Sequence, residues 1–170
     1  IIWNIVYDRG GGDPSSIVVA SYPNNDKYNG LNLAQITKLK GLSPTPDNAA
    51  EILMNLVYEG NGKGIYHCLN EEDVQRIMAH PRIMHASDGS TIEFGEAQPH
   101  PRSYGTYPRV LGQYVREKNV ISLVESIRKM SKLPASVLGI KDRGEIKNGF
   151  WADLVIFDQH KIIDLSLITI

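Results

Sequence analysis

The middle of the chain alternates between helical patterns and short apolar runs that are joined by few residues. Residues 45–60 start with Thr-Pro-Asp, place apolar residues at helical spacing and end at a glycine, which predicts a helix. The run 65–69 predicts a strand, Asn70 with Asp73 resembles the capping box of a following helix, and the apolar run 83–86 predicts a second strand. Helices and strands that alternate in this way favour parallel strands with crossover helices, so the predicted fold class is α/β.

Further elements are expected on both sides of this alternation. Residues 17–20 have the pattern of a short strand and residues 31–40 that of a short helix, while two more helices are expected near 108–118 and 122–131. The last of these has an apolar stripe made of Leu123, Val124, Ile127 and Met130.

The character of the chain changes near residue 140. Residues 152–158 have the pattern of a strand after a turn-rich stretch, and residues 162–163 and 165–168 are strand-like too. We therefore place a boundary between an α/β part, residues 1–140, and a small β part, residues 141–170.

Composition limits the class of protein. With 170 residues, 42% of them hydrophobic, the chain has the character of one globular domain or of a piece of a larger one. A net charge of −1 provides no field that attracts nucleic acid, and no apolar run reaches the roughly 18 residues of a membrane span. The single cysteine, Cys68, fits a reducing compartment, so we expect a cytoplasmic protein with Cys68 buried on a strand. The apolar, β-rich residues 1–7 include no initiator Met and are typical of the interior of a longer polypeptide.

Asp88 is the first candidate for chemistry, because it follows a predicted buried strand and precedes a glycine. In parallel α/β folds binding sites form at the carboxyl ends of strands, so a carboxylate there is a candidate general base or metal-linked acid. An Asp before Gly is equally common in turns, which leaves a structural role open. If Asp88 points inward, strand alternation sends Met84 and Ala86 inward too. His85 and Ser87 then face the other way, which makes His85 a poor metal ligand.

The polar loop at residues 100–112 holds two arginines and two tyrosines among prolines and glycines. Arg102 and Arg109 are candidate anion-binding groups, since a guanidinium grips a carboxylate through two parallel hydrogen bonds. A structural ion pair is the alternative for each of them. Tyr104 and Tyr107 either line a pocket or cover the core with their rings. The sequence contains no H-x-H, C-x-x-C or H-E-x-x-H pattern of a metal site.

These residues resemble the C-terminal portion of the D-aminoacylase (N-acyl-D-amino-acid deacylase) family within the amidohydrolase superfamily. The resemblance covers residues 87–158 closely and in one order, and residues 31–86 more loosely. The segments that carry it are Ser87-Asp88-Gly89, His100-Pro101-Arg102, Tyr104 to Gly112, Ile127-Arg128-Lys129-Met130, Leu133-Pro134-Ala135, Leu138-Gly139, Asp142-Arg143-Gly144 and Gly149 to Asp158.

The resemblance implies a fold and a reaction. The fold is a metal-dependent (β/α)₈ barrel with a small β-sandwich built from both chain ends, of which this chain would contain the C-terminal part of the barrel plus strands of the sandwich. The reaction is hydrolysis of the amide bond of an N-acyl-D-amino acid to a carboxylate and a D-amino acid by a zinc-activated water.

The resemblance also implies roles for two residues. The family's Asp after the last barrel strand transfers the proton, so Asp88 is the expected catalytic residue and a candidate zinc ligand. The Arg of the family's His-Pro-Arg motif binds the substrate α-carboxylate, so Arg102 is the expected substrate-binding residue. Tyr104, from the same loop, is a further substrate-binding candidate.

The family's other metal ligands, an H-x-H pair, a Cys and two later histidines, belong to a portion upstream of Ile1. We therefore expect these 170 residues to lack deacylase activity by themselves. Since they would supply only about two of eight barrel strands, exposed strand edges should favour association with the missing N-terminal portion or with a second copy. Two alternatives stay open: another amidohydrolase of the dihydroorotase type, and a non-catalytic remnant that kept the fold.

Overall fold

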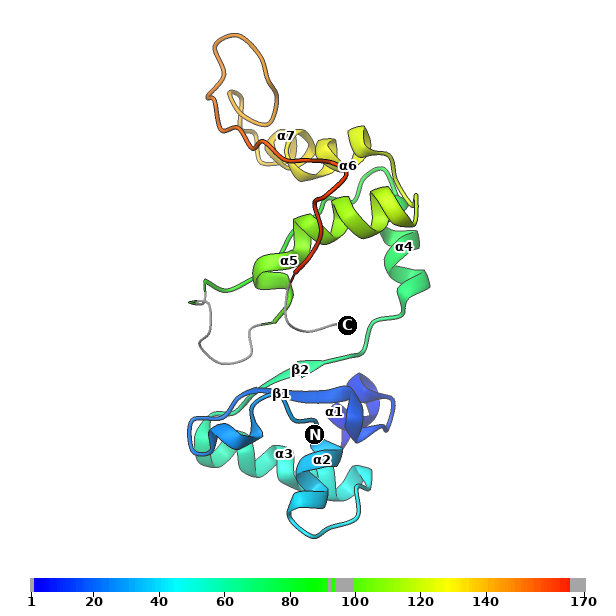
Figure 1. Cartoon of the computed structure of the whole chain (residues 1–170), viewed down its shortest axis with the longest axis vertical. Helices are drawn as coiled ribbons and strands as arrows, with labels where there is room; N and C mark the ends of the chain where they lie inside the picture. The colour runs from blue at the N-terminus through cyan, green and yellow to red at the C-terminus, as the bar shows by residue number, and fades with distance from the viewer. Residues whose placement is uncertain (1, 92, 94–99, 166–170) are drawn as a thin grey trace. The chain divides into compact units, whose positions relative to one another are not determined.

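The computed structural model describes residues 2–91, 93 and 100–165. The chain forms two compact units, whose elements are shown in Figure 1. The first unit consists mainly of Ile1–Leu69 with Thr91–His100, and the second of Asn70–Ser90 with Pro101–Thr169. Each unit has a hydrophobic core of its own.

The first unit combines helices with a pair of strands. Its described elements are α1 (Ile2–Gly10), the 3₁₀ turn η1 (Pro14–Ser16), β1 (Ile17–Ser21), the 3₁₀ turn η2 (Asp26–Tyr28), α2 (Leu33–Leu39), α3 (Pro46–Gly60) and β2 (Lys63–Tyr66). The β-rich residues near the start of the chain thus lie in a helix and not in a strand.

The two helices predicted for this unit are confirmed, and capping side chains mark where they begin. Asn32 Oδ1 accepts a hydrogen bond from Gln35 N before α2, while Gln35 Oε1 accepts one from Asn32 N, both at 2.9 Å. Thr45 Oγ1 accepts from Asn48 N at 3.3 Å before α3. After α3 the chain turns through Asn61, which has the left-handed φ of 50°.

The strands β1 and β2 pair antiparallel, with Ile17 opposite Tyr66. The strands predicted at 17–20 and 65–69 therefore exist, although β2 begins earlier and ends at Tyr66. The parallel pair expected from the alternation, 65–69 with 83–86, is not formed, since residues 83–86 form no strand and β2 pairs with β1 instead. Periodicity locates a strand, but the direction of pairing depends on which strands meet in space, and here β2 meets the distant β1.

Helices α2 and α3 lie on one side of the β1–β2 pair (Figure 1). Their apolar faces and that of β1 form the core of the first unit. Its buried members are Val6, Ile17, Val19, Tyr22, Leu33, Ile36, Ala49, Ala50, Ile52, Leu53 and Leu56. Thr37 is buried as well, and its Oγ1 satisfies its hydrogen-bonding capacity by donating to Leu33 O at 2.6 Å.

The second unit is helical. Its described elements are α4 (Glu71–Ala79), α5 (Arg102–Arg109), the π-helix η3 (Val110–Glu117), α6 (Leu123–Met130) and α7 (Lys132–Val137). The helix predicted near 108–118 begins earlier than expected, at Arg102, passes through Pro108 and continues as η3. Residues 102–107, predicted as part of a loop, are therefore helical. The buried core residues are Met78, Val110, Tyr114 and Ile121.

Several stretches predicted as strands have no sheet partner among the described residues. The runs 83–86, 152–158 and 162–163 form neither helix nor strand. A strand without a partner leaves its backbone donors and acceptors unpaired, and the apolar Ile156 is indeed 99% exposed. The strand-like residues 166–168 lie outside the described residues.

Three further expectations concern Cys68, membrane spans and the boundary near residue 140. Cys68 follows the end of β2 and is exposed, so its predicted burial on a strand is wrong. No helix within the described residues combines the length and the apolar character that crossing a membrane requires. The boundary near residue 140 stays a prediction about the whole protein, since the two compact units divide the chain elsewhere.

Leu33→Ala is expected to lower the free energy of unfolding by about 2–5 kcal/mol, because Leu33 is 0% exposed and its truncation leaves a cavity. Leu39→Ala in the same helix is the control, since Leu39 is 67% exposed. We expect the control to change stability by less than about 0.5 kcal/mol. Urea denaturation followed by circular dichroism measures both, and equal losses would contradict this assignment of the core.

Candidate active site

Asp88 and Arg102, the two residues singled out most strongly by the sequence, lie side by side in the second unit. Arg102 Nη2 is 3.3 Å from Asp88 Oδ2. Asp88 belongs to the segment between α4 and α5, and Arg102 is the first residue of α5. Their side chains are 87% and 45% exposed. An ion pair this exposed adds little stability, so either partner can exchange it for another charged group at low cost.

A close backbone approach at Gly89 holds this pair together. A Cβ at Gly89 would lie 2.9 Å from Ser103 Cα and 3.0 Å from Arg102 O. Both are backbone atoms of the first turn of α5, which cannot move aside as a side chain can. Asp88 itself has a left-handed φ of 48°. The turn at Asp88 and Gly89 therefore packs directly on α5, which places the carboxylate beside the guanidinium.

The side chains before this turn alternate in exposure, as the sequence analysis expects of a strand-like segment. Met84, Ala86 and Asp88 are exposed, whereas His85 and Ser87 are half-buried. The alternation expected from the sequence is therefore present, with Asp88 on the exposed side and His85 on the half-buried side. The physical reason is that the His85 amide donates to a backbone carbonyl of α6 at 3.2 Å, which turns His85 toward that helix.

The other residues of the predicted polar loop lie on α5. Tyr104 and Tyr107 are each 41% exposed, so they are neither buried in the core nor fully open to solvent. Arg109 pairs with Asp164 at 3.5 Å, and the Asp164 side chain is only 9% exposed. The structural alternative for Arg109 is thus the one the structure shows. Arg102 is left as the anion-binding candidate.

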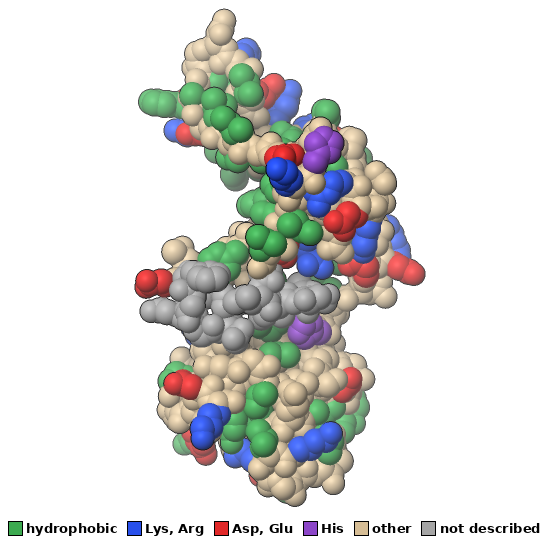
Figure 2. Space-filling model, viewed as in Figure 1, with side chains coloured by type: hydrophobic (Ala, Val, Ile, Leu, Met, Phe, Trp, Pro, Cys, Tyr) green, Lys and Arg blue, Asp and Glu red, His purple; other side chains and the backbone are tan. Residues whose placement is uncertain are grey.

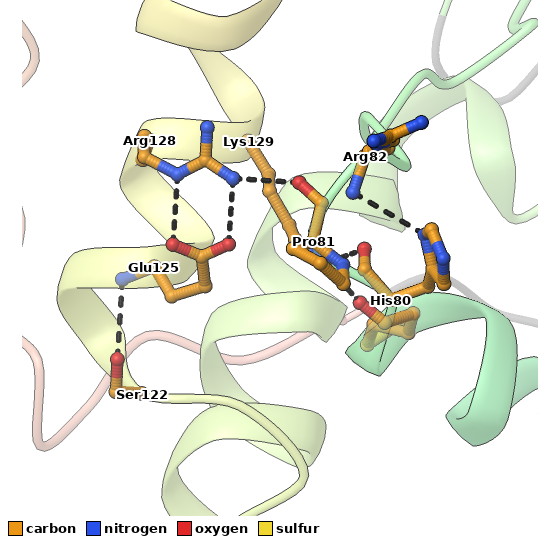
Figure 3. A network of polar contacts seen from close by, with 8 residues as sticks. His80, Pro81, Arg82, Ser122, Glu125, Arg128 and Lys129 are labelled. Atoms are coloured by element: carbon orange, nitrogen blue, oxygen red, sulfur yellow. Dashed lines mark hydrogen bonds and ion pairs between the residues drawn. The ribbon is translucent and has the colours of Figure 1, made fainter.

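Helix α6 holds polar residues for which the sequence analysis proposed no role. Figure 3 shows Arg128 facing Glu125 through two hydrogen bonds of 2.8 Å, and Arg128 Nη2 also donates to Pro81 O at 2.7 Å. Lys129 is 0% exposed, and its Nζ donates to Met78 O and, at 2.7 Å, to His80 O. The one feature of the sequence that could have drawn attention to Arg128 and Lys129 is that they belong to a segment that carries the family resemblance.

The apolar stripe of α6 coincides only in part with its buried face, since Met130 packs against the core of the second unit but other members of the stripe are exposed. The fully buried residues of α6 are Ser126 and Lys129, while Val124 is 80% exposed and Ile127 38% exposed. The helix packs on a segment whose backbone carbonyls need donors, so a polar face is the one that fits there.

Burial and charge perturb the titration of the groups in this cluster. Burial lowers the pKa of His85, the nearby Lys129 lowers it further, and Glu125 opposes the shift. Burial likewise lowers the pKa of Lys129, again opposed by Glu125. The hydrogen bonds from Arg128 hold the pKa of Glu125 below its usual value. His85 Nε2 is buried and has no hydrogen-bond partner, which fits a neutral ring.

A metal site is not assembled by the described residues alone. Within residues 2–91, 93 and 100–165, no three His, Cys, Asp or Glu side chains lie close enough together to hold a metal ion. Asp88 offers one exposed carboxylate, and one ligand does not make a zinc site, which needs at least three protein ligands.

Comparison with known proteins finds similarity to enzymes that are named deacylases and aminoacylases. A family model described as the amidohydrolase family matches residues 32–166. The N-acyl-D-glutamate deacylase of Alcaligenes xylosoxydans xylosoxydans is 44% identical over 100 residues, which are 59% of this chain and 20% of that protein. The chain thus spans about a fifth of the length of the curated relatives it matches.

Solved structures agree with this similarity. An N-acyl-D-glutamate deacylase from Bordetella bronchiseptica, complexed with zinc and a phosphonate inhibitor, has a TM-score of 0.75 and 32% identity, covering 96% of this chain and 31% of that one. A D-aminoacylase with a binuclear metal centre has a TM-score of 0.73 and 33% identity, covering 88% of this chain and 29% of that one.

Gly89→Ala is expected to destabilise the second unit by about 1–3 kcal/mol, since the added methyl group meets the backbone of α5. Gly64→Ala is the matched control, because its Cβ would lie 3.4 Å or more from its neighbours. The control should change stability by less than about 0.5 kcal/mol. Thermal unfolding compares the two variants, and an unaffected Gly89→Ala protein would show that the close approach is not required.

His85 is expected to make stability fall as the solution is acidified below pH 6.5. The pKa of His85 is lowered in the folded state, so below the ordinary histidine pKa of about 6.5 the unfolded chain binds a proton that the folded chain resists. The unfolding free energy therefore rises with pH in this window and levels off above it. Subtracting the profile of His85→Gln from that of the wild type isolates the effect, and parallel profiles would contradict it.

Proposed function

Since this chain belongs to the amidohydrolase family, we propose that the whole protein hydrolyses the amide bond of N-acyl-D-amino acids to a carboxylate and a D-amino acid. Relatives named N-acyl-D-glutamate deacylase and D-aminoacylase support the reaction class. The observation that carries the proposal is the separation of 3.3 Å between Arg102 and Asp88. One carboxylate and one guanidinium at the same place match the two roles that the reaction requires of this part of the protein.

Asp88 is the proposed proton carrier. Amide hydrolysis forms a bond from the oxygen of water to the carbonyl carbon and breaks the bond from that carbon to nitrogen. A carboxylate accepts the proton that the attacking water loses and donates it to the departing nitrogen, which leaves as an amine. Asp88 is 87% exposed, so its oxygens are open to a bound substrate and water.

Arg102 is the proposed clamp for the substrate α-carboxylate. A guanidinium binds a carboxylate through two parallel hydrogen bonds, and Arg102 already faces one carboxylate, that of Asp88. A substrate carboxylate would replace Asp88 in this pair and leave it for proton transfer. Tyr104 lies in the first turns of the same helix and is 41% exposed, which leaves it open to contact the bound substrate.

We infer that zinc is the metal of the whole protein, as in the Bordetella deacylase structure. Zinc supplies an activated water and polarises a carbonyl when it is bound. The described residues do not form its site, so the roles argued here belong to Asp88 and Arg102, and Asp88 is a ligand candidate only together with residues from elsewhere.

We further propose that this chain is the C-terminal part of a (β/α)₈ barrel with strands of a small β-sandwich. The surface of the second unit supports association with a missing portion of the protein or with a second copy. Figure 2 shows apolar side chains on this surface. Exposed apolar residues from α6 onward include Val124, Val137, Leu138, Ile146, Trp151, Leu154, Val155 and Ile156. Apolar groups gathered on a surface mark a binding face.

Asp88→Asn in the complete protein is expected to lower kcat by about 10²–10⁴-fold with little change in KM, because the amide cannot accept the proton. Asp26→Asn is the control, since Asp26 is an exposed carboxylate of the first unit. Steady-state hydrolysis of an N-acyl-D-amino acid measures both. An Asp88→Asn enzyme as fast as the wild type would remove Asp88 from the mechanism, and a wild type without activity would indicate a non-catalytic remnant.

Arg102→Met is expected to raise KM by about 10–100-fold, the loss of a charged hydrogen-bonded contact, with a smaller effect on kcat. Arg76→Met is the control, because the Arg76 side chain is 76% exposed on α4. Substrates whose α-carboxylate is converted to an amide should bind both the wild type and Arg102→Met equally weakly. A large preference of the Arg102→Met enzyme for the free carboxylate would contradict the assignment.

A further inference from the structure

Lys129 is a buried lysine at a position that an apolar side chain of similar length could also fill. Its residue is 0% exposed, and burial lowers the pKa of its ammonium group. Burying a charge costs free energy, and an apolar side chain of similar length would fill the same volume without that cost. The ammonium group must therefore do something that an apolar side chain cannot.

The ammonium group binds backbone carbonyls at the C-terminal end of α4 and just after it. Lys129 Nζ donates to Met78 O, in the last turn of α4, and to His80 O at 2.7 Å (Figure 3). Carbonyls at the end of a helix lack partners within the helix, and a cation there interacts favourably with the helix dipole. Lys129 thus satisfies these acceptors from a neighbouring helix.

The same turn of α6 makes two more backbone contacts with this segment. Arg128 Nη2 donates to Pro81 O at 2.7 Å, and Glu125 keeps the guanidinium in place from its other side. Further along, His85 N donates to the Lys129 carbonyl at 3.2 Å. Lys129 therefore holds the segment both with its side chain and with its own backbone.

Asp88 lies between two points at which the chain contacts neighbouring helices. The chain is fixed at His85 by α6 and at Gly89 by the backbone of α5. Between them it has no helix or strand to support it. The position of the Asp88 carboxylate therefore depends on where Lys129 holds the segment before it.

We propose that Lys129 is a positioning residue for Asp88, acting through the backbone of residues 78–85. This inference rests on the proposed function for its effect on catalysis, but the anchoring is observable without catalysis. A shift of about 1 Å in a reacting group lowers turnover by as much as 10²-fold. Substrate binding through Arg102, which α5 holds independently, should be spared.

The test uses the complete protein with Lys129→Met, Lys129→Arg and the control Lys161→Met, whose side chain is 84% exposed. Lys129→Met should lower kcat by about tenfold or more and leave KM within about twofold. Lys129→Arg, which keeps a charged donor, should recover most of the loss, and Lys161→Met should match the wild type. An unchanged kcat in Lys129→Met would overturn the proposal.

A double-mutant cycle separates positioning from a general loss of structure. If Lys129 acts through Asp88, then adding Lys129→Met to Asp88→Asn should cause no further loss of turnover. A further loss of the same factor as in the wild type would show that Lys129 acts independently of Asp88, which overturns the proposal.

Amide hydrogen exchange gives a readout that does not need activity. Lys129→Met should speed the exchange of residues 85–89 and leave α2 and α3 unchanged. If the complete wild-type protein hydrolyses no N-acyl-D-amino acid, the proposed function fails while this measurement still decides the anchoring. Unchanged exchange at residues 85–89 would overturn it. If Lys129→Met does not fold, Arg128→Met, which removes the bond to Pro81 together with the ion pair to Glu125 on the same helix, should show the same local increase to a smaller extent, and its absence would count equally against the proposal.

Discussion

The position of the segment between α4 and α5 depends on backbone acceptors that have no partner within their own helix. The carbonyls of Met78, His80 and Pro81 are satisfied by Lys129 and Arg128 of α6. The segment has no ladder or helix of its own, so these few hydrogen bonds replace regular structure. Everything that follows along the chain up to Gly89, including the carboxylate of Asp88, starts from this anchored point.

Satisfying those acceptors explains why α6 is oriented as it is. A helix normally buries its apolar stripe, and α6 has one, yet its fully buried residues are Ser126 and Lys129. Leaving a buried carbonyl such as that of Met78 unpaired costs about 1–3 kcal/mol, which offsets the gain from burying an apolar side chain. Met130 packs against the core of the second unit, whereas Val124 and Ile127 remain exposed and add to the exposed apolar side chains of that unit.

The chain belongs to the amidohydrolase family and shares with its relatives the segment that carries Asp88 and Arg102. It spans about a fifth of the curated relatives' length, and its described residues contribute one candidate ligand rather than a metal site. The division of labour we propose follows from this: these residues contribute proton transfer and carboxylate binding, and the metal is held together with residues from other parts of the protein.

Local chemistry by itself determined α2 and α3, because a cap or a stop acts within a few residues: Asn32 and Thr45 begin these helices wherever they pack. It also selected Asp88 and Arg102, since a resemblance depends on residue identity. The tertiary structure decided what depends on a distant partner. The direction of the β1–β2 pair and the failure of residues 83–86 to form a strand depend on which backbone is available for pairing. The outward orientation of Asp88 and the role of Lys129 depend on the approach of α6 to carbonyls far away in the sequence, and hydrophobic periodicity carries no information about such contacts.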